Sequence, residues 1–230
     1  NLVEPSQNWL NYSSETIKIV SSRLDRLLPG RIIALRPELV NENFMRPIRR
    51  APNGSFIAMD GATINSIEPS GYWDDYSPDF VRLFCAWREG QTKEKTCHVP
   101  SPIERNTGNY GENLITGSQM GDADAVLFNR FIAIRRAQVV EHLTKTVKAE
   151  TEGKALTMCF FGYLNALGWD LPASGHLALR EVQSITSLDV IGAPYSYKAS
   201  RQLGHAMQPE GVGDSARLYG KLYITEDDTK

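Results

Sequence analysis

The chain has 230 residues, 41% hydrophobic and 23% charged, a composition typical of globular proteins. Its net charge of −2 and pI near 6.1 provide no basic surface of the kind that binds nucleic acid or acidic membranes. No run of about 18 apolar residues is present, so no transmembrane helix is expected. We therefore expect no nucleic-acid or membrane partner. The sequence is compatible with a cytoplasmic or a secreted protein.

The first predicted elements are a helix over residues 10–27 and a short buried strand, "RIIALR", at 31–36. The segment "LLPG" (27–30) ends the helix. The stretch 40–70 is polar, punctuated by Pro and Gly, and aperiodic, which predicts a long loop. The helix prediction rests on apolar residues at helical spacing: Leu10, Ile17, Val20, Leu24 and Leu27.

The middle of the chain predicts two helices separated by an irregular segment. In "DYSPDFVRLFCAW" (75–87), Ser77 is the expected N-cap and Pro78 the first helical residue. Residues 90–122 predict a second long loop. A long helix is then expected from about 123 to 150, because apolar residues recur along one side of that segment.

The last third of the chain predicts a parallel arrangement of strands. Apolar strands are expected at 155–164, 188–197 and 221–226, with a helix at 175–185 and a possible helical turn in "GDSARLYG". No hairpin turns join these strands, which favours parallel α/β architecture.

Each predicted strand is followed by polar or aromatic residues: "RPELVNEN", "GYLN", "PYSY" and "TEDD". In parallel α/β folds, functional sites gather at the carboxyl ends of the strands. We therefore interpret the carboxylates that close the chain, beginning at Glu226, as part of a functional site.

The three cysteines predict no metal site. Cys85, Cys97 and Cys159 form no CxxC pair, and no cluster offers four ligands at metal spacing. Cys159 lies in an apolar run and is predicted to be a buried thiol.

Two segments, "SGHLALREVQSITSLDVIGAPYSY" and "DSARLYGKLYITEDDTK", resemble the catalytic barrel of β-galactosidase-like glycoside hydrolases of the family 42 type in clan A. "FFGYL" and the helix in "DYSPDFVRLFCAW" also have counterparts there. The resemblance covers about residues 70–230 well and residues 1–70 loosely. It implies a (β/α)₈ TIM barrel of which this chain, taken as one domain over 1–230, holds the central part, about strands 4 to 7.

The resemblance also implies the catalytic pair. Such enzymes place an acid/base glutamate, preceded by asparagine, after the fourth strand, and a nucleophilic glutamate after the seventh. In this chain the dipeptide is Asn41-Glu42 in "VNEN", and the nucleophile is Glu226 at the end of "KLYITE". Glu38 and Glu68 remain substitutes for Glu42.

Five side chains are expected to bind substrate. Asn41 would bind the sugar 2-hydroxyl, a contact that strengthens in the transition state. Tyr195 and Tyr197 end the preceding strand and would hydrogen-bond the nucleophile or simply pack. Trp73 and Trp169 would stack on sugar faces or pack.

The sequence thus predicts a retaining glycosidase acting on β-linked, galactoside-like sugars, without metal or organic cofactor. The alternative is a non-catalytic homologue that binds carbohydrate or is structural in a larger assembly. Four strands leave two unpaired edges, so the remaining barrel segments are expected from the same or another chain, with a homo-oligomer possible.

Overall fold

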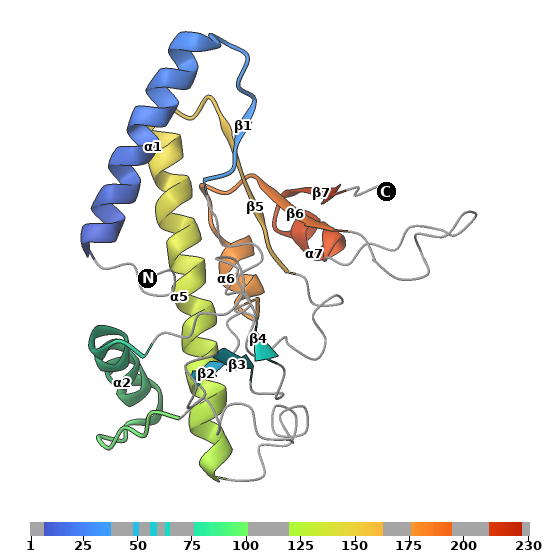
Figure 1. Ribbon diagram of the computed structural model, residues 1–230. Coiled ribbons are helices and arrows are strands. Elements are labelled where there is room, and N and C mark those ends of the chain that lie inside the picture. The colour runs from blue at the N-terminus through green and yellow to red at the C-terminus, as the bar shows by residue number, and fades with distance from the viewer. Residues whose placement is uncertain are drawn as a thin grey trace. The chain divides into compact units, whose positions relative to one another are not determined.

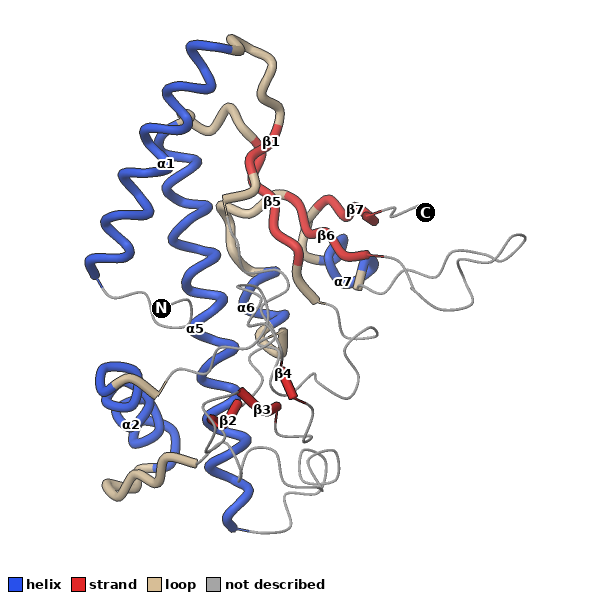
Figure 2. The backbone as a smooth tube through the Cα atoms, in the orientation of Figure 1, coloured by secondary structure: helices blue, strands red, loops and turns tan. Residues whose placement is uncertain are grey.

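The computed structural model describes residues 7–37, 48–50, 56–58, 63–64, 76–100, 120–162, 176–194 and 212–226 (Figures 1 and 2). The chain divides into two compact units. Unit 1 consists of Asn1–Glu4, Glu42–Arg135 and Trp169–Leu177, and unit 2 consists of Pro5–Asn41, Arg136–Gly168 and Ala178–Lys230.

Unit 2 is built on a four-stranded parallel sheet, which confirms the predicted α/β class. Its strands are β1 (Ala34–Leu35), β5 (Leu156–Phe160), β6 (Val190–Pro194) and β7 (Leu222–Glu226), in the order β1-β5-β6-β7. Every neighbouring pair is parallel. The buried strands β5 and β6 lie in the middle, and β1 and β7 are the edges among the described strands.

Helices α1 (Gln7–Leu27), α6 (Leu179–Gln183), α7 (Gly213–Leu218) and the second half of α5 (Met120–Glu150) belong to unit 2. The bounds of α1 and α5 agree with the predicted helices to within about three residues. The two helices pack side by side (Figure 1), with the His142 Nε2 atom 3.0 Å from the Ser14 Oγ atom. α6 is shorter than the predicted helix at 175–185, because turns occupy residues on both sides of it.

A polar network ties the amino edge of this sheet to α5. The ammonium group of Lys148 lies 2.6 Å from the Asp189 carboxylate and donates to the Ala155 carbonyl at 3.0 Å. The same Asp189 oxygen accepts the backbone N–H of Thr157 at 2.8 Å. The network therefore joins the C-terminal turns of α5 to the starts of β5 and β6.

Asp189→Asn is expected to destabilise unit 2 by about 2 kcal/mol at neutral pH, because it removes a charge-assisted hydrogen bond. Burial acts to raise the pKa of the Asp189 carboxyl, but the hydrogen bonds from Lys148 and Thr157 outweigh it and hold the pKa below its ordinary 3.8. A depressed folded-state pKa stabilises the fold fully above that ordinary value, and the stabilisation is lost as pH falls towards the folded-state pKa.

Urea unfolding of both proteins between pH 3 and pH 7 measures this effect. The stability difference between wild type and Asp189→Asn should stay constant from pH 7 to about pH 5 and shrink below about pH 4. A difference that grows as the pH falls would contradict the proposed role of the Lys148–Asp189 pair.

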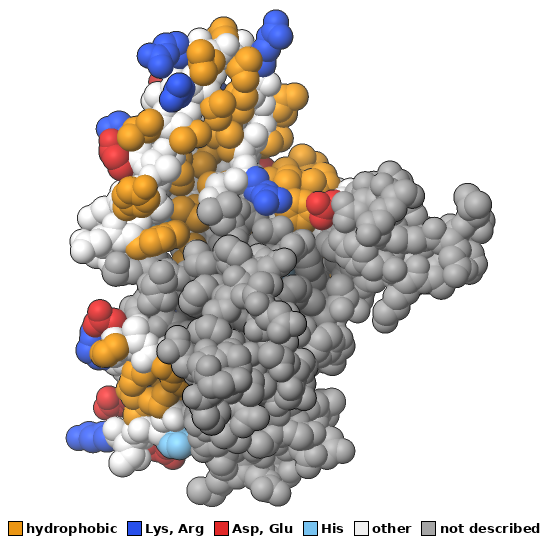
Figure 3. Space-filling view, viewed as in Figure 1, with side chains coloured by type: hydrophobic (Ala, Val, Ile, Leu, Met, Phe, Trp, Pro, Cys, Tyr) orange, Lys and Arg blue, Asp and Glu red, His pale blue; other side chains and the backbone are white. Residues whose placement is uncertain are grey.

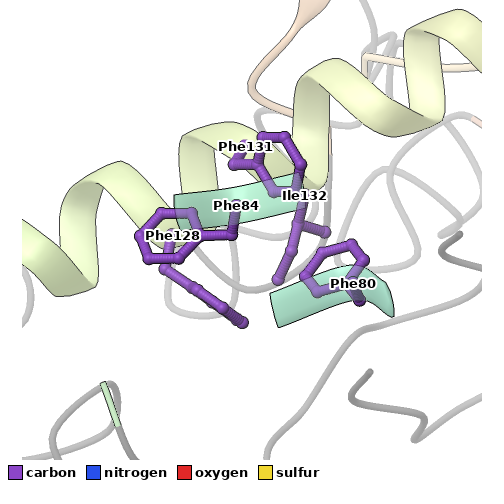
Figure 4. Packing of buried hydrophobic residues seen from close by; sticks show 5 residues of the cluster. All are labelled: Phe80, Phe84, Phe128, Phe131 and Ile132. Atoms are coloured by element: carbon purple, nitrogen blue, oxygen red, sulfur yellow. The ribbon is translucent and has the colours of Figure 1, made fainter. Parts of the chain in front are cut away.

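Unit 1 is organised by an aromatic core between α2 (Pro78–Thr92) and the first half of α5. The cap is as predicted: the Ser77 hydroxyl accepts the Phe80 N–H, and Pro78 begins the helix. Figure 4 shows the core, in which edge-to-face and tilted ring contacts favour a fixed geometry. Its buried members are Phe80, Phe84, Phe128, Phe131 and Ile132.

Two further links hold α2 in unit 1. Cys85 and Cys97 form a disulfide, which the spacing of the cysteines did not predict. The guanidinium of Arg88 donates to the Asp124 carboxylate of α5 at 2.5 Å and to the Thr96 carbonyl at 2.7 Å. The segment that follows α2 is therefore linked to the helix by the Cys85–Cys97 disulfide and by the hydrogen bond from Arg88 to the Thr96 carbonyl.

The predicted loop at 40–70 contains a small antiparallel sheet, which the sequence analysis did not predict. Its strands β2 (Ile48–Arg50), β3 (Phe56–Ala58) and β4 (Thr63–Ile64) pair in chain order. Strands of two or three residues are too short to show the alternation that identifies a strand in a sequence.

Candidate functional site

The carboxyl edge of the unit 2 sheet carries the residue that the sequence analysis proposed as nucleophile. Glu226 is the last residue of β7 and stands opposite Pro194, the last residue of β6. Its side chain is half-buried. Because all four strands are parallel and lie in chain order, their carboxyl ends meet along one edge, and Glu226 lies there.

An arginine and an aromatic ring lie together at the same edge. Arg36 directly follows β1, and its guanidinium lies 5.0 Å from the centre of the Phe160 ring. That distance is within cation–π range. Phe160 and Phe161 are both buried at the end of β5, and we call these two rings the apolar floor. The edge therefore combines this apolar floor with the positive charge of Arg36.

A second arginine is buried on α5. Arg136 is 2% exposed, and burial lowers its pKa to about 9. Lys148, at the amino edge of the sheet, follows Arg136 by twelve residues, or about 18 Å of helix. A five-residue strand spans about 17 Å. α5 and β5 run in opposite directions (Figure 1), so Arg136 precedes the Lys148 contact at the amino edge by about the length of β5.

Gly162 shapes the backbone as the chain leaves β5. Its φ of +85° lies in the left-handed region, which residues with a Cβ atom rarely adopt. A Cβ atom there would lie 3.0 Å from the Leu179 Cδ1 atom and 3.1 Å from the Val212 Cγ2 atom. The first residue of α6 and the residue before α7 therefore lie close to the backbone at the carboxyl edge.

Gly162→Ala is expected to destabilise unit 2 by about 2 kcal/mol, from the left-handed φ together with crowding. Gly153→Ala is the matched control: φ there is +74°, but nothing lies within 4 Å of its Cβ position. Chemical denaturation should show the smaller loss for Gly153→Ala. Equal losses would mean that Leu179 and Val212 move aside at no cost.

Of the sequence-predicted site residues, the structure describes Glu226 alone. Glu42 and the substitutes Glu38 and Glu68 lie outside the described residues. The same is true of Asn41, Tyr195, Tyr197, Trp73 and Trp169. The distance between the Glu42 and Glu226 carboxyl groups therefore stays a prediction.

Neither Arg36 nor Arg136 was predicted from the sequence as a site residue. Arg36 carried a usable signal, because it is a charged residue at the carboxyl end of the apolar strand predicted at 31–36. Arg136 carried none, since "IRRAQ" in a long helix is also typical of a solvated face. Cys159, by contrast, is buried as predicted.

A cavity in unit 2 lies at the opposite edge of the sheet. It has a volume of about 310 Å³ and is bounded by the C-terminal ends of α1 and α5 and by the chain leading into β1 and β5. Its charged lining residues are Asp25, Glu150, Glu152 and Lys154, and Lys154 is paired with Glu152 at 2.7 Å. The cavity is thus separate from the edge that carries Glu226.

Searches against family models, curated proteins and solved structures found no match to this chain. Within the described ranges, no three or more His, Cys, Asp or Glu side chains are grouped to hold a metal ion. None of the described helices is long and apolar enough to cross a membrane.

Proposed function

We propose that this chain is the central part of a glycoside hydrolase-like (β/α)₈ barrel that cleaves β-linked, galactoside-like sugars with retention of configuration. The observation that carries the proposal is the four-stranded parallel sheet in chain order, with Glu226 as the last residue of β7. Consecutive parallel strands are the arrangement of one arc of such a barrel, whose active sites lie at the carboxyl ends of the strands. In this proposal β1, β5, β6 and β7 are strands 4 to 7.

The proposed chemistry uses two carboxyl groups. Glu226 attacks the anomeric carbon and forms a covalent glycosyl–enzyme intermediate, while Glu42 protonates the departing oxygen. Glu42 then removes a proton from the water that releases the sugar. The mechanism requires no metal or organic cofactor.

The carboxyl edge offers further support for sugar binding. An apolar floor with an adjacent arginine suits a pyranose, which presents both C–H groups and hydroxyls. Asn41, Tyr195, Tyr197, Trp73 and Trp169 complete the proposed substrate contacts. The other barrel strands come from the same or another chain.

Incubating the protein with aryl β-glycosides and following the anomer first released by NMR tests this function. We expect β-galactoside turnover with the β-anomer released first. Release of the α-anomer would contradict the retaining mechanism. Sugar binding without turnover would favour the non-catalytic, carbohydrate-binding alternative.

A further inference from the structure

The cavity bounded by α1, α5 and the chain leading into β1 and β5 takes no part in the proposed glycosidase mechanism. Every residue that lines it belongs to unit 2 and to the described ranges, so its shape and charge are set within one unit. Its volume of about 310 Å³ is within the range of small-molecule pockets. The cavity is therefore large enough for a small organic molecule.

One wall of this cavity is a single face of α1 that combines polar and apolar side chains. Four lining residues are spaced by three and four positions, which places them on one face of the helix: Ser21, Leu24, Asp25 and Leu28. Within that face, Ser21 and Asp25 are one helical turn apart, and so are Leu24 and Leu28. The wall therefore presents a hydroxyl and a carboxylate beside two leucines.

Ser21 is a buried polar residue without a partner. It is 6% exposed and is the one buried residue of α1. Its hydroxyl makes no hydrogen bond within the part of the chain that the structure describes. Buried polar groups nearly always have a hydrogen-bond partner. Because Ser21 lines the cavity, a ligand bound there supplies the missing partner.

The lining is acidic. Three carboxylates, Asp25, Glu150 and Glu152, face one ammonium group, Lys154, which gives a net charge of −2. Lys154 lies 2.7 Å from Glu152, and its pKa is raised mainly by Glu152 and least by Asp25. Asp25 and Glu150 have no ion-pair partner among the described residues. The cavity therefore attracts a cation.

The backbone adds to this negative potential. α1 ends at Leu27 and α5 ends at Glu150, and both ends lie at the cavity. The C-terminal end of a helix carries a partial negative charge. The two helix ends therefore act in the same direction as the carboxylates.

Basic side chains are also exposed around this end of α1 (Figure 3). Arg23 and Arg26 do not line the cavity, and their positions in the sequence place them on other faces of the helix than Ser21 and Asp25. The acidic character therefore belongs to the cavity and not to the helix as a whole.

The lining favours an organic cation over a metal ion. Protein sites for hard metal ions bring several oxygen ligands to within about 2.6 Å of one ion. Within the described ranges, no three His, Cys, Asp or Glu side chains are grouped in that way. Ile32, Leu35 and Ala155 extend the apolar part of the lining. An apolar wall beside a carboxylate suits an alkyl group that ends in a charged nitrogen.

We propose that this cavity binds a small aliphatic amine in its ammonium form. The ammonium group donates hydrogen bonds to the Asp25 carboxylate and to the Ser21 hydroxyl. The alkyl chain packs on Leu24 and Leu28. The inference uses neither the carboxyl edge of the sheet nor the closure of a barrel, so it stands or fails independently of the proposed function.

Titrating the protein with n-hexylamine at pH 7 and recording two-dimensional amide NMR spectra tests the site. The amine is protonated at that pH, as the lysine side chain is. We expect saturable shift changes centred on residues 21–28 and 150–155. 1-Hexanol, which has the same chain without the charge, should bind at least about tenfold more weakly. Equal binding of the alcohol, or shift changes centred elsewhere, would overturn the proposal.

Three variants identify the groups that bind the amine. Asp25→Asn should weaken hexylamine binding about tenfold or more, because it removes a charge-assisted hydrogen bond. Ser21→Ala should weaken it about threefold and keep α1 intact, since alanine is the best helix former. Glu15→Gln is the matched control, because Glu15 is an exposed carboxylate of α1 that does not line the cavity. Unchanged binding in Asp25→Asn, or an equal loss in Glu15→Gln, would contradict the proposed site.

Discussion

Glu226→Gln is expected to lower turnover of an aryl β-galactoside by about 10⁴-fold or more, the loss typical of removing a covalent nucleophile. An amide has nearly the shape of a carboxylate but carries no charge, so it cannot attack the anomeric carbon. The side chain is half-buried at the end of β7, where the swap should preserve packing. We therefore expect the change in kcat with little change in stability.

Glu181→Gln is the matched control, because Glu181 is an exposed carboxylate on α6. Turnover of Glu181→Gln should stay within about twofold of wild type, since Glu181 is an exposed side chain that the proposed mechanism does not use. Unchanged turnover in Glu226→Gln would remove Glu226 from the mechanism.

Replacing Glu226 by glycine and adding azide shows whether Glu226 is the nucleophile or the acid/base. In Glu226→Gly, added azide should restore part of the turnover and yield the α-glycosyl azide, because the anion attacks from the face that the carboxylate vacated. A β-glycosyl azide would instead assign Glu226 as the acid/base and contradict the proposed roles of Glu226 and Glu42.

Asp124→Ala is expected to destabilise unit 1 by about 3 kcal/mol, because it leaves the buried guanidinium of Arg88 without its closest anion. The side chains of Arg88 and Asp124 are 9% and 12% exposed. The hydrogen bond from Asp124 raises the pKa of Arg88, so the guanidinium stays charged at every accessible pH. The Glu94 carboxylate lies 3.0 Å from the Arg88 guanidinium but is 61% exposed, so it compensates only partly for the lost Asp124 charge.

Two companion variants isolate the cause in urea unfolding experiments. Arg82→Ala breaks an exposed ion pair with Asp79 on α2 and should change stability by no more than about 0.5 kcal/mol. Combining Arg88→Met with Asp124→Leu should recover much of the loss, because no unpaired charge remains. A double variant as unstable as Asp124→Ala would show that the loss has another origin.

The sequence by itself determined the elements whose signals are local. Ser77 and Pro78 begin α2 because a capping oxygen and a preset φ act within one helical turn. The apolar periodicity of α5 and the apolar runs of β5, β6 and β7 likewise predict their own element types, and the absence of hairpin turns predicted their parallel pairing. The burial of Cys159 follows from the same run. For the site, the apolar run "KLYITE" predicted that Glu226 is a carboxylate at the end of a strand.

Only the tertiary structure decided what depends on residues far apart in the chain. The short strands β2 to β4, the Cys85–Cys97 bond and the Arg88–Asp124 pair need partners that no local pattern identifies. Arg136 is a further case, since its buried position follows from packing around α5 and leaves no mark in the sequence. Helix and strand preferences act over a few residues, whereas burial, charge pairing and strand order are set by long-range packing free energy.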